Sequence, residues 1–385
     1  MGVSLRSYHN AFLLNSLFIV LIISCFLDDI QARIVKVESG NCGCYNGSWV
    51  YDESYPLYDS SQCPFIPEGF GCEASGRPDK EYLKYRWNPT GGCDPPKFDG
   101  LDFVKRFKGK KIMFVGDSIS QKQWVFFTCM IHAAIPTAKF TTANGLPETC
   151  IYIELYGYKL QWTLILDPTY IWTYIWTLHG YIFYTPPQAL EETPERILKI
   201  DTISTGDPWK EVDVVIFNTW HWWFHKGRLQ HWDKIQEGNK TYKDIDDRTV
   251  AFAKGLITWS TWVDNNIDPN KTRVFYQGIS PTHMKGKDWG FPHTSCADHT
   301  TPFNVTTYPG IPEPGVAVLK EVLSKMSNPV IFLDVTTMSQ LRKDAHPSHY
   351  ANKDGTSRDC SHWCVAGLPD TWNRLLYVSI VLGQK

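Results

Sequence analysis

The chain has 385 residues, of which 20% are charged, and its formal net charge at neutral pH is -2. This length suits one large α/β domain with an appended module, while the near-neutral charge argues against a nucleic-acid partner and against a polybasic membrane-binding surface. Aromatic residues make up 14% of the chain and include 16 tryptophans, which is typical of a large core or of a groove that binds sugars.

An apolar run from Ala11 to Leu27 lies between Arg6 and Asp28. Its length falls between the apolar core of a signal peptide and a bilayer-spanning helix, and its charge order favours a cytoplasmic N-terminus. No good small-residue cleavage site follows the run. We therefore predict that residues 1–32 form an uncleaved signal anchor with a short stem, which makes the protein a single-pass type II membrane protein. The alternative is a cleaved signal peptide and a secreted protein.

Ten of the eleven cysteines lie after this run, which indicates disulfide bonds in an oxidising compartment. Paired C-x-x-C units with adjacent histidines do not occur, so we predict no metal site. Four glycosylation sequons also suit a secretory route, at Asn46, Asn239, Asn270 and Asn304.

Residues 33–98 form a predicted cysteine-rich N-terminal module. Five cysteines and many Gly, Pro, Asp and Tyr residues lie between 42 and 98, without a long apolar period. Tyr82–Trp87 is the only stretch here that we predict to be a strand, and Arg86 is expected to brace a carboxylate. The cysteine pairing cannot be deduced from the spacing. We expect Cys360 and Cys364 to bridge outward, to Cys296 and to this module.

Residues 99–385 are predicted to form the catalytic domain, which begins with a short helix over 99–107. Apolar β-rich runs follow at wide intervals, at Ile112–Val115, Val212–Phe217, Arg273–Tyr276 and Val330–Val335. Helical patterns separate several of them, at 119–133, 246–265 and 315–326. This order predicts an α/β fold with a parallel sheet covered by helices on both faces.

The stretch from 141 to 205 does not fit this scheme. Ile151–Leu166 alternates like an antiparallel hairpin, and Tyr170–Tyr184 is rich in aromatic residues. We interpret the stretch as a β-rich excursion from the sheet.

Gly116-Asp117-Ser118 follows the first apolar run and precedes a helix, which places the serine at the carboxyl edge of the predicted sheet. A serine hydroxyl needs an imidazole to take its proton, and the imidazole needs a carboxylate to hold its tautomer. Asp359 and His362, three residues apart, supply both groups. The alternatives are that Ser118 only caps the helix and that Asp359 and His362 belong to a surface turn.

The Gly-Asp-Ser block and the Asp-x-x-His pair are similar to those of GDSL/SGNH esterases. Over nearly its whole length beyond the anchor, the chain resembles the plant trichome birefringence-like family of cell-wall polysaccharide O-acetyltransferases. The matching segments include Cys44-Tyr-Asn-Gly-Ser-Trp-Val-Tyr-Asp, Tyr82-Leu-Lys-Tyr-Arg-Trp, Phe114-Val-Gly-Asp-Ser, Phe217-Asn-Thr-Trp-His-Trp-Trp, Gly278-Ile-Ser-Pro-Thr-His, Gln340-Leu-Arg-Lys-Asp-Ala-His-Pro-Ser and Asp359-Cys-Ser-His-Trp-Cys.

The resemblance implies an SGNH-hydrolase-like fold in which Ser118 is the acyl-accepting nucleophile, His362 the base and Asp359 its orienting acid. It also implies a Golgi membrane setting and an acetyl ester on a wall glycan as the product. We expect no bound cofactor, but an acetyl donor is required. Xylan is the default acceptor. A polysaccharide acetylesterase and a non-catalytic wall-glycan binding protein are the alternatives.

Further residues are candidates around this triad. The backbone N–H of Ser118 and the amide of Asn218 are expected to form the oxyanion hole, although Asn218 could instead bond its own turn. An acceptor-sugar platform is predicted at Trp220, His221, Trp222 and Trp223, with core packing as the alternative. A polar cluster that could order the loop of Asp359 and His362 is formed by Arg342, Asp344, His346 and Ser348. Within this cluster, His346 is the rival to His362 as the base.

Two features depart from the family pattern. The family commonly continues with an Asn-rich segment after Gly-Asp-Ser, whereas here Lys122 places a cation near the nucleophile. The segment 167–195 is longer and more aromatic than the family suggests.

Overall fold

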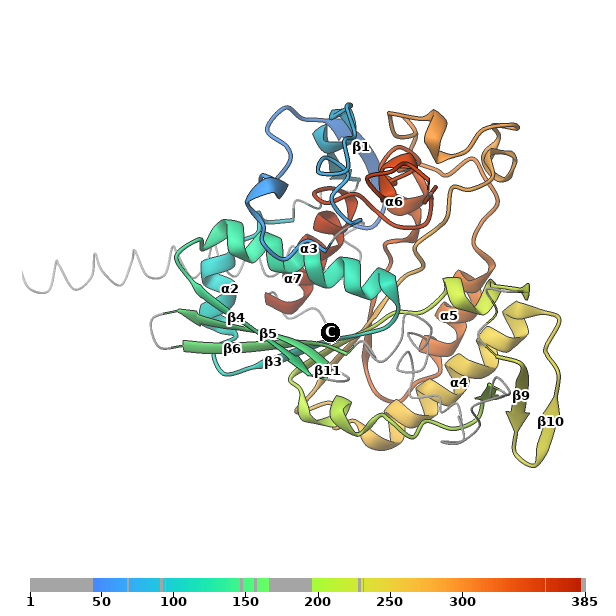
Figure 1. Ribbon diagram of the computed structural model, residues 1–385. Coiled ribbons are helices and arrows are strands. Elements are labelled where there is room, and N and C mark those ends of the chain that lie inside the picture. The colour runs from blue at the N-terminus through green and yellow to red at the C-terminus, as the bar shows by residue number, and fades with distance from the viewer. Residues whose placement is uncertain are drawn as a thin grey trace, which may run out of the picture.

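The computed structural model describes residues 44–381 except 68, 91, 92, 94, 146, 147, 156, 157, 166–195, 228, 229, 231 and 357 (Figure 1). The predicted signal anchor over 1–32 and the aromatic stretch Tyr170–Tyr184 therefore lie outside the described residues. Within the described part, none of the helices combines the length and the apolar character that crossing a membrane requires.

A seven-stranded sheet runs through the centre of the described chain in the order β12-β11-β8-β3-β6-β5-β4. Its strands are β3 Lys111–Val115, β4 Lys139–Gly145, β5 Glu148–Leu155, β6 Tyr158–Ile165, β8 Val214–Phe217, β11 Arg273–Gln277 and β12 Val330–Leu333. The five strands from β12 to β6 pair in parallel, as the crossover spacing predicted.

The β5–β6 hairpin is antiparallel, which confirms the alternation in that stretch. It is not a separate excursion, because β6 pairs in parallel with β3 and the hairpin, together with β4, extends the main sheet. The sheet is therefore mixed. Periodicity could reveal the hairpin but not its partner, because pairing with β3 joins segments about fifty residues apart.

Alternate residues of the central strands enter two different cores, since successive side chains point to opposite faces of a strand. Ile112 and Phe114 pack with helices α2 (Gly100–Arg106), α3 (Ser118–Ala134) and α7 (Leu368–Val381). Met113 and Val115 pack with α4 (Arg248–Asn266) and α5 (Pro314–Ser324). Helices thus cover both faces, and the predicted α/β architecture is confirmed (Figure 1).

Smaller elements complete the described fold. A second sheet, of order β10-β9-β7, is formed by β7 Ile197–Lys199, β9 Lys234–Glu237 and β10 Lys240–Tyr242. The short helix α6 spans Thr336–Gln340. The 3₁₀ turns of the described chain include η2 Glu81–Lys84, η4 His221–Phe224 and η7 Cys296–Asp298.

The described part of the N-terminal module contains two strands rather than the single one predicted. β1 (Gly47–Tyr51) pairs with β2 (Tyr85–Pro89), and the first part of the predicted strand is the 3₁₀ turn η2. The sequence did not reveal β1 because Trp49 is its only large buried side chain, so the strand has little periodic pattern. Trp49 also donates a hydrogen bond from Nε1 to the Met338 carbonyl at 2.8 Å, which ties the module to the α/β part of the chain.

Four disulfides between described residues join these parts. Cys296–Cys360 and Cys72–Cys364 confirm the two expected outward bridges. Cys44–Cys93 closes the module on itself, and Cys63–Cys129 attaches it to α3. The module therefore shares the core of the α3 face instead of folding around a core of its own.

Candidate active site

Ser118 is the first residue of α3, and two residues, Gly116 and Asp117, separate it from the end of β3. The Asp117 carboxylate caps the helix by accepting a hydrogen bond from the Ile119 N–H at 2.9 Å. The helix cap is therefore Asp117, and the hydroxyl of Ser118 is left for other contacts. Gly116 makes this tight turn possible, because a Cβ there would lie 2.5 Å from the carbonyl oxygen of Asn218, at the end of neighbouring β8.

The structure brings Ser118, His362 and Asp359 together. His362 Nε2 lies 2.6 Å from Ser118 Oγ, and His362 Nδ1 lies 2.7 Å from Asp359 Oδ2. A carboxylate can only accept, so the imidazole donates from Nδ1 and Nε2 is left to accept the serine proton. The surface-turn alternative for Asp359 and His362 does not describe this arrangement, in which both side chains are mostly covered.

The surroundings of Asp359 keep its carboxyl group ionised. Its Oδ1 accepts hydrogen bonds from the backbone N–H groups of Ser361 and His362, at 2.9 and 3.0 Å, and from the Ser361 hydroxyl at 2.8 Å. Burial alone would raise the pKa of this carboxyl group, but the His362 imidazole and the backbone donors hold it far below its usual value. The carboxylate therefore orients His362 through one oxygen and its own loop through the other.

The Asp359 loop, residues 359–364, is clamped from several sides. The bridge Cys296–Cys360 connects it to η7, and Cys72–Cys364 connects it to the N-terminal module. Ser348 and Asp359 exchange both backbone hydrogen bonds, at 2.7 and 3.0 Å. The stapled module thus holds the loop that brings His362 to Ser118.

The predicted polar cluster supports this loop. Arg342 and Asp344 form a fully buried ion pair at 3.0 Å, and Arg342 also donates to the Tyr82 carbonyl at 2.6 Å. Ser348 contributes through the backbone exchange with Asp359. His346 lies 2.6 Å, through Nδ1, from the His362 carbonyl oxygen.

His346 is not placed to act as the base. Its ring stacks on Trp363, is 1% exposed, and uses its other nitrogen to contact His283 Nδ1 at 2.7 Å. His283 Nε2 in turn lies 2.9 Å from the Gln340 carbonyl oxygen. The sequence indicated no specific role for His283, because two histidines some sixty residues apart give no spacing signal.

The two histidines form three contacts that each need an N–H, one between the rings and one to each carbonyl. Burial lowers the pKa of His283 to about 4 and that of His346 well below its usual value, so the pair is neutral near neutral pH. A neutral pair carries one N–H per ring, two in all. It therefore satisfies the ring-to-ring contact and only one carbonyl, that of Gln340 or that of His362.

Asn218 directly follows β8 and lies beside the turn of Ser118, with its backbone N–H donating to the Val115 carbonyl at 3.1 Å. Its side chain is 2% exposed, and Oδ1 is buried without a partner among the described residues. The alternative of an asparagine side chain bonded to its own turn is therefore not what the structure shows. The backbone N–H of Ser118 lies in the first turn of α3, where amides have no intrahelical acceptor. The backbone of Asn218 and the N–H of Ser118 thus lie at the same edge of the sheet, after β8 and β3.

The aromatic platform needs correction at two of its four residues. Trp220 and Trp223 are buried in the α4 face core, at 7% and 6% exposure. The Trp220 ring rests on Gly315, where no side chain could be accommodated. These rings cannot present a face to a sugar, because helix packing already covers them. Trp222 and His221 are half-buried and remain candidates.

His221 also borders the nucleophile turn. Its Nε2 donates to the Ser280 carbonyl at 2.7 Å. Burial lowers the pKa of His221 and raises the pKa of Asp117. The opposite charges of the two groups act against both shifts, because each group favours the charged form of the other. The second oxygen of Asp117 is buried without a partner among the described residues.

Lys122, the departure from the family pattern, lies one helical turn after Ser118 and is 1% exposed. Its ammonium lies 3.3 Å from the centroid of the Phe70 ring. Burial lowers the pKa of Lys122 to about 7, although the negative charge of Asp359 acts to raise it. The cation is thus a buried neighbour of the triad rather than a surface group.

Comparison with known proteins places these features in context. Residues 96–379 match the model of a family described as the GDSL/SGNH-like acyl-esterase family found in Pmr5 and Cas1p, and residues 40–94 match the PMR5 N-terminal domain. Similar proteins include trichome birefringence-like 42 of Arabidopsis thaliana, at 46% identity over 95% of this chain and 98% of that protein. Trichome birefringence-like 41 of the same plant is 47% identical, over 87% of this chain and 89% of its own length.

Proposed function

The chain belongs to the trichome birefringence-like family and carries a GDSL/SGNH-like acyl-esterase domain, and from this we propose that it is an O-acetyltransferase acting on a plant cell-wall polysaccharide. The observation that carries the proposal is the chain of contacts from Ser118 Oγ to His362 Nε2 at 2.6 Å and from His362 Nδ1 to Asp359 at 2.7 Å. These are the distances that proton transfer from a serine nucleophile requires.

The first half of the reaction loads the serine. His362 Nε2 takes the Ser118 proton as Oγ bonds to the carbonyl carbon of the acetyl donor. The resulting oxyanion accepts hydrogen bonds from the Ser118 N–H and the Asn218 amide. When the tetrahedral intermediate collapses, the bond to the donor's leaving group breaks and His362 returns its proton to that group. Asp359 stabilises the imidazolium throughout.

The second half transfers the acetyl group. A glycan hydroxyl takes the place of the leaving group, His362 removes its proton, and its oxygen attacks the acetyl-serine carbonyl. Collapse breaks the bond to Ser118 Oγ, which recovers the proton from His362. The products are an O-acetylated sugar and the free enzyme, and the chemistry consumes no cofactor.

The same residues would hydrolyse an acetyl ester if water replaced the glycan hydroxyl in the second half. Polysaccharide acetylesterase is therefore the second candidate, and the esterase description of the matching domain favours it. A non-catalytic glycan-binding protein is the third candidate. The contact of Ser118 Oγ with His362 Nε2, which glycan binding alone does not need, argues for catalysis.

We place the reaction in the Golgi lumen, with the chain anchored as a type II protein through its N-terminal segment. Four disulfides agree with an oxidising compartment. The four sequon asparagines are all exposed and thus accessible to glycosylation. Xylan is the proposed acceptor.

The deciding experiment supplies full-length protein in detergent with an activated acetyl ester and xylan oligomers. Mass spectrometry then follows the Ser118 peptide and the oligomers. We expect acetyl-serine, followed by acetylated oligomer, and neither product with Ser118→Ala. Release of acetate without acetylated oligomer would identify an esterase. Acetylated oligomer from Ser118→Ala at the native rate would refute the proposed chemistry.

A further inference from the structure

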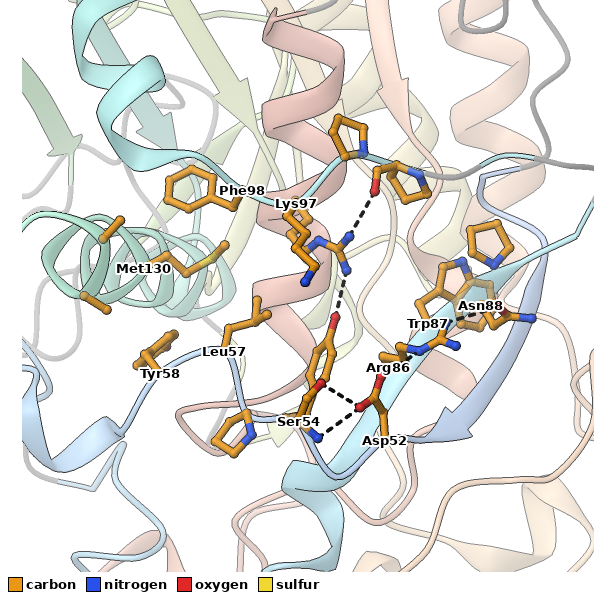
Figure 2. A pocket seen from close by; sticks show the side chains of 18 of the residues that line it. Asp52, Ser54, Leu57, Tyr58, Arg86, Trp87, Asn88, Lys97, Phe98 and Met130 are labelled. Carbon is orange, nitrogen blue, oxygen red and sulfur yellow. Dashed lines mark hydrogen bonds and ion pairs between the residues drawn. The ribbon is translucent and has the colours of Figure 1, made fainter. Parts of the chain in front are cut away.

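A pocket of about 870 Å³ lies between the N-terminal module and the far end of α3 (Figure 2). Its helical wall includes Met130 and Ala134, whereas Ser118 begins the same helix. An α-helix rises ~1.5 Å per residue, so this wall lies roughly 20 Å from the nucleophile. The pocket is therefore separate from the candidate active site, and its volume is in the range of ligand-binding pockets.

The charges in the pocket wall do not balance. The described lining residues include three basic side chains, Arg86, Lys97 and Arg374, but Asp52 as the single carboxylate. Arg86 and Asp52 form an ion pair at 2.9 Å, which confirms the bracing role expected for Arg86 and cancels both charges. Two positive charges are left for a ligand.

Arg374 is held in place by neutral groups. It donates to the Tyr55 hydroxyl oxygen at 2.8 Å and to the Pro95 carbonyl at 3.1 Å. Burial raises the pKa of Tyr55, so this phenol stays uncharged and does not neutralise the guanidinium. The Nε of Arg374 is buried without a hydrogen-bond partner in the described part of the chain. An anion in the pocket would satisfy the charge that the protein leaves uncompensated.

Lys97 supplies the second free charge. Its side chain is exposed and forms no hydrogen bond or ion pair with the residues that the structure describes. Figure 2 shows it directed into the space between Leu57 and Arg86. A mobile ammonium at this position can follow an anion that enters the pocket.

The remaining wall combines the polar side chains of Ser54 and Asn88 with apolar surface. Tyr55 and Phe98 are half-buried, Leu57 is 41% exposed, and several prolines lie beside them. A small inorganic anion would leave this surface in contact with water. The lining instead suits a ring that has apolar faces and carries a carboxylate, because ligand sites combine apolar walls with a few polar groups that set orientation.

We propose that this pocket binds a carboxylate-bearing sugar unit, such as a uronic acid residue of an acidic glycan. The choice of a glycan as the carrier of that carboxylate rests on the proposed function. The site acts far from the reacting atoms, so it contributes to acceptor affinity equally in the ground state and the transition state. It therefore favours chains of the proposed xylan acceptor that carry uronic acid units over neutral ones, and lowers KM for these chains without changing kcat.

Calorimetry on the full-length protein tests the proposal in the absence of any acetyl donor, so that binding is measured without catalysis. The probes are a galacturonic acid trimer, the neutral trimer xylotriose and inorganic phosphate. The variants are Lys97→Gln, Lys97→Arg and Lys105→Gln. Lys105 is an exposed lysine of α2 outside the pocket lining, and its substitution removes the same charge.

We expect the acidic trimer to bind more tightly than xylotriose and to lose affinity as salt is raised. Lys97→Gln should weaken the acidic trimer by ~3- to 5-fold, the usual size of one exposed ion pair, and leave xylotriose unaffected. Lys97→Arg should restore the affinity, and Lys105→Gln should match the native chain. Equal affinity for the two trimers, equal effects of Lys97→Gln and Lys105→Gln, or equally tight binding of phosphate would each overturn the proposal.

The outcome is independent of the transfer reaction. If acetyl transfer fails with every glycan while the acidic trimer still binds through Lys97, the proposed function is wrong and the pocket assignment stands. If acetyl transfer succeeds but Lys97→Gln leaves the acidic trimer unaffected, the pocket assignment is wrong and the proposed function stands.

Discussion

Asp359→Asn is the sharpest test of the triad, because the structure dictates how the new amide must lie. Oδ1 of Asp359 accepts from two backbone N–H groups and the Ser361 hydroxyl, so only the carbonyl oxygen of an asparagine can occupy that position. The amide NH₂ is then directed at His362 Nδ1, where the carboxylate Oδ2 lies 2.7 Å away in the native chain.

An NH₂ donor at this position forces Nδ1 to accept, which moves the imidazole proton to Nε2. Nε2 then faces Ser118 Oγ with a proton of its own and cannot take the serine proton. The corresponding substitution in serine proteases lowers kcat by ~10⁴, and we expect a loss of ~10³- to 10⁴-fold here, with little change in shape or volume. Because the pKa of Asp359 is held far below its usual value, the native activity should not fall through titration of this carboxylate in mildly acidic buffer.

The assay measures kcat for release of acetate or transfer of acetyl from an activated ester, together with the melting temperature. Asp354→Asn is the matched control, since Asp354 also accepts from a backbone N–H two residues later, at 3.0 Å, but is exposed and outside the triad. A folded Asp359→Asn protein that retains activity within tenfold of the native chain would refute the assigned tautomer, and with it the orienting role of Asp359.

Three further predictions concern the surroundings of the triad. Gly116→Ala should destabilise the protein by ~1–3 kcal/mol in chemical denaturation, because its Cβ would meet the Asn218 carbonyl; unchanged stability would contradict the close approach. Lys122→Met should stabilise the protein by ~2 kcal/mol at pH 6, where the native chain must bury an ammonium. That advantage should shrink as pH rises from about 7 toward the unfolded lysine pKa, because the unfolded native chain binds more protons over this window; a pH-independent difference would refute the lowered pKa. His346→Ala should destabilise the protein by ~2–4 kcal/mol and lower kcat more than KM, because it removes the ring stacked on Trp363 and the contact to the His362 carbonyl; a fall in stability with kcat unchanged would limit His346 to a packing role.

Much of the geometry of the candidate active site followed from local sequence. A strand that stops at Gly-Asp-Ser must turn there, and the helix that follows places Ser118 at the sheet edge, where the structure has it. Asp359 and His362 meet because three residues of one turn separate them. The polar residue after β8, Asn218, was also identifiable, since parallel strands bring their carboxyl ends to one edge.

Contacts between distant segments had no such signature. Nothing in the spacing joins His283 to His346, sets β6 beside β3, or shows that the rings of Trp220 and Trp223 face helices instead of solvent. Each of these contacts depends on which helices and strands pack together in the folded chain. Many different packings are compatible with the same local residue pattern.

Sequence alone therefore determined the types of the main elements and the chemistry available at one turn and one loop, because both are set within a few residues along the chain. Tertiary structure alone decided that His362 reaches Ser118 across 244 residues of separation, and that a charged pocket forms behind the same helix. The physical reason is that burial and charge balance are properties of packed surfaces, and those surfaces are assembled from residues that the sequence keeps far apart.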